Sequence, residues 1–168
     1  MKEKDCCFTN GNNWFRYRTG AIIVENGCVL FTGSKSIDYY YTVGGGVHMG
    51  EKAEDCIERE VLEETGVPYK VDHLGMIVEN FFTGKDGPFD GLDCHVLEFY
   101  FVMKSRGSQD VTCKSINADG DLEELHWVPI EDIPTTNIKP SFLRERLPEL
   151  LKSDHILHVT TDADRKPS

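Results

Sequence analysis

The stretch over residues 44–67 constrains this chain more than any other part of the sequence. An aromatic and β-branched run, YYYTV over residues 39–43, leads directly into three consecutive glycines at 44–46. Consecutive glycines let a backbone approach a ligand closely and expose bare N–H and C=O groups. Residues 51–65 then predict a helix that ends at Gly66, because a glycine in that place can cap the C-terminus. The stretch therefore predicts a strand, a glycine turn and a helix in succession.

The predicted helix carries far more acid than a surface helix usually does. Lys52 and Arg59 are its only cations, and they oppose the acids Glu51, Glu54, Asp55, Glu58, Glu60, Glu63 and Glu64. Like charges four residues apart destabilise a helix by roughly a few tenths of a kcal/mol, and Glu60 and Glu64 form such a pair. The helix therefore either tolerates a small loss or has a partner that offsets the repulsion.

The helical periodicity places two of these acids on the apolar side. At about 100° per residue, Ala53, Cys56, Ile57 and Val61 form one stripe, and both Glu60 and Glu64 fall within it. Glu63 lies at its edge, one turn beyond Arg59. Carboxylates on a core-facing side need a cation or an ion pair, and oxygen ligands on a rigid helix suit Mg²⁺ or Mn²⁺. A solvated acidic helix is the alternative interpretation.

Three familiar ligand-binding motifs do not fit this part of the chain. A P-loop requires a lysine where Glu51 stands, and a dinucleotide fingerprint requires a third glycine where Met49 stands. A calcium loop beginning at Asp86 would have Pro88 at its third position and Leu97 at its twelfth, where oxygen ligands are required. These motifs are therefore excluded.

The segment resembles the Nudix box, and it matches that motif at every fixed position. The matching residues are Gly45, Glu51, Arg59, Glu60, Val61, Glu63, Glu64, Gly66 and Val67. The flanks are similar to Nudix domains as well, including the hairpin before the box, the apolar strand over 95–103 and the late segment LHWVP over 125–129. The resemblance covers roughly residues 16–152. It implies an α/β fold of the Nudix type, an α/β/α sandwich with a mixed β-sheet between helices.

The resemblance also implies roles for individual residues. Glu60 and Glu64 would be the main ligands of Mg²⁺ or Mn²⁺, Glu63 would contribute to or support that site, and the backbone carbonyl of Gly44 would be a further ligand. Arg59 would orient a carboxylate and Glu51 would support the site. The substrate-binding candidates implied by the same resemblance are Gly45, Gly46 and Asn137.

The implied activity is a metal-dependent pyrophosphohydrolase that cleaves a nucleoside diphosphate linked to another moiety, by attack of water on phosphorus. A divalent cation neutralises the pyrophosphate and activates the attacking water. The base would be a box glutamate or an acid from outside the box. Candidates for that base and for further metal ligands come from the acidic residues before Trp127, with Asp121 and Glu123 preferred over Asp119 and Glu124. The alternative function is a non-catalytic nucleotide sensor of the same fold.

The motifs that mark particular Nudix substrates are absent. The arrays typical of NADH hydrolases and coenzyme A hydrolases do not occur, and the proline of many ADP-ribose hydrolases is not at its usual place, since Pro88 comes later. Asn137 is similar to a purine-reading asparagine of dGTP-cleaning relatives, although its spacing differs by one residue. The sequence therefore predicts a small phosphorylated nucleotide-type substrate without naming it.

The rest of the chain predicts a single domain with two short extensions. Residues 1–15 are expected to be a loose lead-in, 16–152 the domain and 153–168 a C-terminal extension. Asn-Gly at 26–27 predicts a hairpin turn. Further strands are expected over 67–79, 95–103 and 124–128 and in the segment HILHV, a second helix over 140–151, and loops over 81–93 and 105–120.

The charge balance narrows the range of partners. The net charge is −11 and the pI is near 4.9, which disfavours duplex nucleic acid and anionic membranes. No signal or membrane segment is evident, so a cytoplasmic location with reduced cysteines is expected. A homodimer is left open. The adjacent pair Cys6 and Cys7 is interpreted as two ordinary thiols, with soft-metal binding or redox sensing as the alternative.

Overall fold

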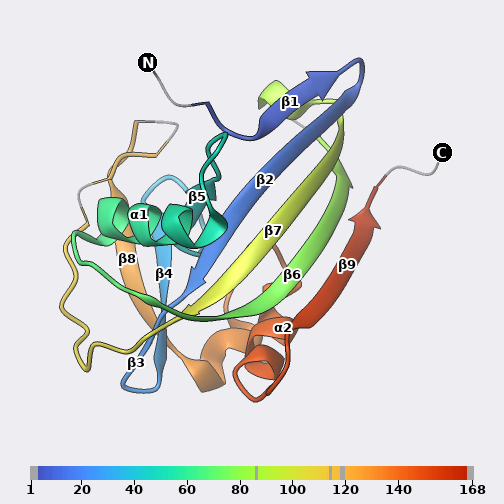
Figure 1. The fold of residues 1–168 in the computed structure, drawn as a ribbon. Helices are drawn as coiled ribbons and strands as arrows, with labels where there is room; N and C mark the ends of the chain where they lie inside the picture. The colour runs from blue at the N-terminus through green and yellow to red at the C-terminus, as the bar shows by residue number, and fades with distance from the viewer. Residues whose placement is uncertain (1–3, 86, 114, 118–119, 166–168) are drawn as a thin grey trace.

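The computed structural model describes residues 4–85, 87–113, 115–117 and 120–165. Its strands and helices follow one another along the chain as drawn in Figure 1. The order is β1 (Cys7–Asn10), β2 (Asn13–Ile22), β3 (Val24–Glu25), β4 (Cys28–Ser34), β5 (Gly44–Gly46), α1 (Ala53–Thr65), β6 (Val71–Thr83), the 3₁₀ turn η1 (Gly87–Phe89), β7 (Asp93–Met103), β8 (Glu123–Pro129), the 3₁₀ turn η2 (Ile130–Thr135), α2 (Leu143–Leu150) and β9 (Leu157–Asp164).

Two sheets organise these elements. The larger has the order β1-β2-β7-β6-β9, with β5 paired to β2. It is mixed, because β2 runs parallel to β7 and β6 runs parallel to β9, whereas β6 and β7 are antiparallel. The smaller sheet, β3-β4-β8, is antiparallel.

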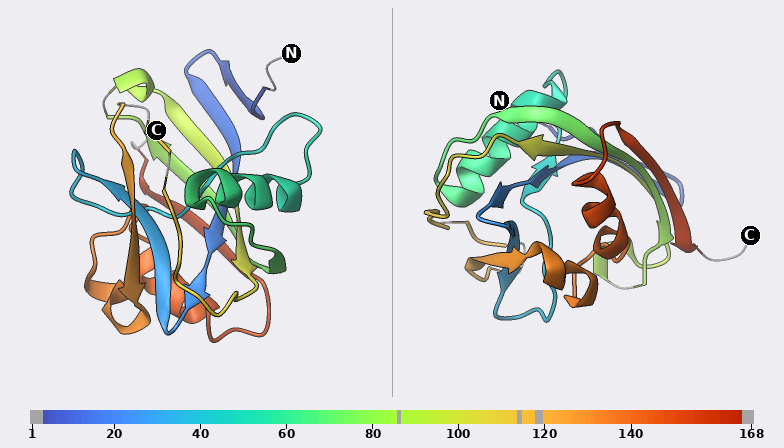
Figure 2. Two further views of the ribbon diagram at one scale, coloured as in Figure 1. Left: turned by 90° about the vertical axis from the view of Figure 1, so that its left-hand side faces the viewer. Right: turned by 90° about the horizontal axis from the view of Figure 1, so that it is seen from below.

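The larger sheet is curved, and one helix covers each of its faces. Seen from below in Figure 2, α2 lies inside the curve and α1 lies against the outer face. One core cluster, which includes Ala21, Ile57 and Phe101, fills the space under α1. A second, which includes Met76 and Leu147, joins the inner face to α2 and the smaller sheet. The predicted α/β class, with a mixed sheet between helices, is confirmed.

The local turn predictions agree with the structure. Asn26 and Gly27 both have positive φ, at 50° and 74°, and join β3 to β4 as the Asn-Gly signal predicts. Gly66 caps α1 with a φ of 69°, and its N–H donates to the carbonyl of Leu62. Among the described residues, no helix is both long and apolar enough to span a bilayer.

The secondary structure expected for both ends of the chain needs correction. Residues 7–10 and 13–22 pair as an antiparallel hairpin, so much of the expected lead-in belongs to the sheet. β9 is a full strand that pairs in parallel with β6, not a short addition. β6 also extends to Thr83, into the expected loop, because its end pairs with the start of β7. The division into a domain and two extensions remains a prediction.

Candidate active site

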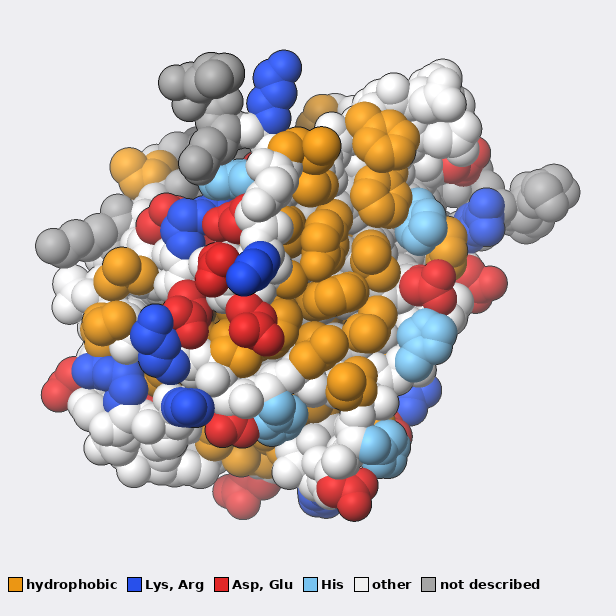
Figure 3. Space-filling view, viewed as in Figure 1, with side chains coloured by type: hydrophobic (Ala, Val, Ile, Leu, Met, Phe, Trp, Pro, Cys, Tyr) orange, Lys and Arg blue, Asp and Glu red, His pale blue; other side chains and the backbone are white. Residues whose placement is uncertain are grey.

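Helix α1 carries its acids to one end of a large cleft. Its apolar stripe is buried as predicted, with Cys56, Ile57 and Val61 packed under the helix and Glu64 continuing the same side. The cleft has a volume of about 1030 Å³ and is lined by Glu60, Glu63 and Glu64 together with residues from β2, β6, β9 and the surrounding loops. Figure 3 shows charged side chains gathered over α1 beside a band of hydrophobic side chains over the neighbouring strands.

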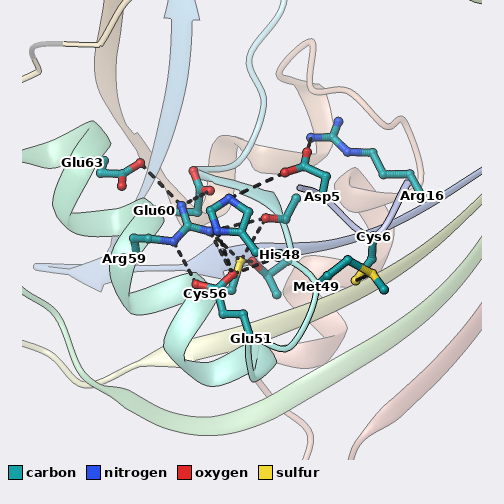
Figure 4. A network of polar contacts seen from close by, with 12 residues as sticks. Asp5, Cys6, Arg16, His48, Met49, Glu51, Cys56, Arg59, Glu60 and Glu63 are labelled. Carbon is teal, nitrogen blue, oxygen red and sulfur yellow. Dashed lines mark hydrogen bonds and ion pairs between the residues drawn. The ribbon is translucent and has the colours of Figure 1, made fainter. Parts of the chain in front are cut away.

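Arg59 organises the acidic side chains around it (Figure 4). Its guanidinium holds Glu51 through two contacts, Nε to Oε1 at 2.8 Å and Nη2 to Oε2 at 3.0 Å. It also donates to Glu60 Oε1 at 2.6 Å and lies 3.5 Å from Glu63. The hydrogen bond from Arg59 lowers the pKa of Glu51 to about 2, so Glu51 is ionised and fixed. The fixed Glu51 carboxylate thus holds the Arg59 guanidinium, and Arg59 in turn holds the carboxylate of Glu60.

Glu64 is the buried acid of the group, with 9% of its surface exposed. It accepts hydrogen bonds from the Gly44 N–H at 3.2 Å and from the Thr32 hydroxyl at 3.4 Å. Burial, followed by repulsion from Glu123 and Glu60, raises its pKa to about 8. The charges of Glu123 and Glu60 therefore both act on a carboxyl group that is already buried.

Glu60 lies against strand β5. The expected strand over 39–43 and the glycine turn after it are wrong, because the three glycines themselves form the strand that pairs with β2. Burial raises the pKa of Glu60, and Arg59 opposes that effect. A Cβ placed on Gly45 would overlap the carboxyl group of Glu60, so only a glycine leaves room for it. The repulsion at Glu64 fits a hard divalent cation held by oxygen ligands. Within the described ranges, no three His, Cys, Asp or Glu side chains are already grouped closely enough to hold a metal.

Glu123 is the acid from outside the box that reaches the cleft. It stands at the start of β8, where the Tyr41 hydroxyl donates to Oε1 at 2.6 Å and Ser115 donates to Oε2. Asp121 lies in the preceding loop, and its N–H donates to the Asn117 side chain; it is not among the residues that line the cleft. Glu124 lies 3.6 Å from His126, and Asp119 falls outside the described residues.

The substrate-binding candidates occupy different places. Gly45 is beside Glu60, whereas the carbonyl of Gly46 accepts from Arg59 Nη2 at 3.4 Å. Asn137 donates to the carbonyl of Asp38 at 2.9 Å, outside the residues that line the cleft. The N–H of Gly44 is used by Glu64, and the ligand role of its carbonyl remains a prediction.

Two polar groups near the box are not among the predicted site residues. Arg18 and Glu98 face each other across β2 and β7 on the inner side of the sheet. In addition, Asp5 lies 3.6 Å from His48 and 3.7 Å from Arg16, beside the box loop. A charged residue on an otherwise apolar strand face is the signal that marks Glu98, but its partner is fixed only by long-range pairing.

The mixed sheet between helices, with acids of α1 lining a cleft, is the arrangement that the resemblance to Nudix domains implies. Residues 14–150, most of the chain, match the family model described as the NUDIX domain. The chain therefore belongs to the Nudix hydrolase family.

Individual relatives agree with that assignment. A Mycobacterium tuberculosis protein named as a MutT4 mutator protein is 35% identical over 94 residues, which is 54% of this chain. The match spans only 33% of that relative's length. The MutT protein structure from Methanosarcina mazei Go1 has a TM-score of 0.65 at 20% identity and covers 86% of this chain and 100% of its own. The dihydroneopterin triphosphate pyrophosphohydrolase of E. coli has a TM-score of 0.63 at 16% identity, covering 83% and 99%. At these identities the two structures show a shared fold.

Proposed function

We propose that the protein is a pyrophosphohydrolase that requires Mg²⁺ or Mn²⁺ and cleaves a small nucleoside diphosphate derivative. One observation carries this proposal: Glu60, Glu64 and Glu123 line the same cleft, and the charges of Glu60 and Glu123 both disfavour the ionised form of the buried Glu64. Such a group is unfavourable by itself and favourable once a cation lies between its members. The Nudix fold of the chain supports the same conclusion.

The proposal assigns a separate catalytic or metal-binding role to each of these residues. Glu60 and Glu64 would hold the cation, which neutralises phosphate charge and makes an attacking water more acidic. Arg59 and Glu51 keep the carboxylate of Glu60 in place through the contacts described above. Glu123 would accept the proton of the attacking water, because the Tyr41 hydroxyl fixes its orientation without neutralising it.

The roles of Glu63, Gly44 and Asp121 are secondary in this proposal. Glu63 has 59% of its side chain exposed and would support a further cation at the mouth of the cleft. Gly44 would add its carbonyl, and Asp121 remains the second candidate for the proton acceptor. The absence of duplex nucleic acid as a partner, the cytoplasmic location and the homodimer also stay predictions.

A substrate panel tests the proposed function. Purified protein would be incubated with ADP-ribose, nucleotide sugars, dinucleoside polyphosphates and nucleoside triphosphates, with Mg²⁺ or with excess EDTA, and the products identified by mass spectrometry. We expect Mg²⁺-dependent cleavage of at least one member and loss of that cleavage in Glu60→Gln. Tight Mg²⁺-dependent binding without any hydrolysis would overturn the proposal in favour of a nucleotide sensor.

A further inference from the structure

A row of polar side chains crosses the floor of the cleft beyond the box acids. It runs along the inner face of the larger sheet, through the neighbouring strands β2, β7, β6 and β9, and consists of Arg18, Glu98, Asn80 and Thr161. Arg18 is in register with Glu98, and Asn80 is in register with Thr161. Arg18, Asn80 and Thr161 all line the cleft. None of these residues belongs to the box.

Arg18 keeps its hydrogen-bonding capacity for a ligand. Its side chain is 25% exposed, and its contact with Glu98 is 3.8 Å long, which is too far for a hydrogen bond. Among the residues that the structure describes, its guanidinium donates no hydrogen bond. A guanidinium carries five N–H donors in a fixed plane, so this one presents unused donors to the cleft.

Glu98, on the neighbouring strand β7, places a buried carboxyl group 3.8 Å from the Arg18 guanidinium. Only 2% of its surface is exposed, and the Tyr100 hydroxyl donates to its Oε1 at 3.3 Å. Its Oε2 has no hydrogen-bond partner in the described part of the chain, which is an unusual state for a buried carboxyl oxygen. A carboxylate 3.8 Å from the guanidinium weakens its pull on a second anion, so Arg18 suits a neutral acceptor better than a phosphate.

Aromatic side chains border the same floor. Phe82 follows Asn80 on the same strand face, and Tyr39 and Phe142 line the cleft as well. Aromatic rings stack on the flat faces of nucleobases and do not distinguish one base from another. The polar row between them is therefore the feature that can distinguish bases.

We propose that Arg18, positioned by Glu98, determines base specificity by binding the carbonyl edge of the substrate's nucleobase. Guanine, uracil and thymine present a carbonyl oxygen at that edge, whereas adenine presents an amino group, which would meet the Arg18 donors unfavourably. The enzyme should then favour guanine and uracil nucleotides over adenine nucleotides. This inference rests on the proposed function, since it places the base in the same cleft as the box acids.

Binding without metal tests the inference separately from catalysis. Isothermal titration with GMP, UMP and AMP in EDTA should give wild-type affinities for GMP and UMP roughly ten-fold above that for AMP. Arg18→Gln should abolish that difference. Arg18→Lys should abolish most of it too, because lysine keeps the charge but loses the planar fork. Arg16→Gln is the matched control: the residue lies on the same strand face, pairs with Asp5 and does not line the cleft.

Kinetics with Mg²⁺ complete the test. For substrates that differ only in the base, Arg18→Gln should raise KM for the guanine and uracil forms and leave kcat within about two-fold. Glu98→Gln, a positioning change, should reduce the base preference with its melting temperature kept close to that of wild type. Equal losses with every base would overturn the inference, since Arg18 would then contact a part that all the substrates share. Base-selective binding without turnover of any substrate would instead overturn the proposed function alone.

Discussion

Replacing Glu64 by glutamine should stabilise the metal-free protein. Glu64 has 9% of its surface exposed, and burial together with the charges of Glu123 and Glu60 raises its pKa from 4.5 to about 8. Glutamine has nearly the same shape and keeps a carbonyl oxygen for the Gly44 N–H, which now donates at 3.2 Å. The substitution therefore removes the unfavourable charge and preserves the hydrogen bond.

The sign and size of the effect follow from the shift in pKa. Below pH 4.5 Glu64 is protonated in both the folded and the unfolded chain, so its charge costs no stability. Between pH 4.5 and pH 8 the unfolded chain releases the proton first, so the free energy of unfolding falls as the pH rises. With the pKa at about 8, the loss is about 1 kcal/mol at pH 5 and about 4 kcal/mol at pH 8.

Urea unfolding in EDTA at pH 5 and pH 8 measures this loss. The advantage of Glu64→Gln over wild type should grow between the two pH values, and added Mg²⁺ should stabilise wild type more than the variant. Glu63→Gln is the matched control, because it removes the same charge from a side chain that is 59% exposed. Equal unfolding free energies for wild type and Glu64→Gln at pH 8 would refute the reasoning.

Two further substitutions test the contact between Gly45 of β5 and Glu60, and the buried carboxylate Glu25 away from the site. Gly45→Ala should lower kcat roughly 100-fold, because the added methyl displaces the Glu60 carboxyl group. Near-normal turnover would show that this contact between Gly45 and Glu60 does not matter for activity. Glu25→Gln should destabilise the fold by about 1–3 kcal/mol at pH 7. Burial raises the pKa of Glu25, but hydrogen bonds from residues 105–107 and Tyr69 outweigh burial and lower it overall. The Glu25 contribution should thus shrink as the pH falls below 4.5 and be lost below the lowered pKa of the folded state, and a difference in urea unfolding that does not shrink below pH 4.5 would contradict this account.

The sequence predicted the box and its helix well because the determining interactions are local. The buried stripe of α1, the cap at Gly66 and the hairpin at Asn26 and Gly27 each depend on residues a few positions apart. The ends of the chain were harder to predict, since β2 pairs with β7 and β9 pairs with β6 over long separations. A polar, turn-rich start therefore looked loose although it forms a hairpin.

The same distinction applies to the candidate site. Arg59 was expected to orient a carboxylate, but the motif did not say which one, and the structure pairs it with Glu51 and Glu60. The pairing of Arg18 with Glu98 depends on the register between two distant strands, which no local pattern contains. Glu123 rather than Asp121 lines the cleft because β8 begins at Glu123, and that boundary could not be located within a run of acids.

Manganese binding measured together with turnover tests the central claim most directly. Free Mn²⁺ would be followed by electron paramagnetic resonance during titration of wild type, Glu60→Gln, Glu64→Gln and the exposed control Glu54→Gln, and the same samples assayed with the best substrate of the panel. The account predicts that Glu60→Gln and Glu64→Gln weaken Mn²⁺ binding and lower turnover by roughly 100-fold or more, while Glu54→Gln matches wild type in both. Unchanged Mn²⁺ affinity and near-normal turnover in both box variants would contradict it.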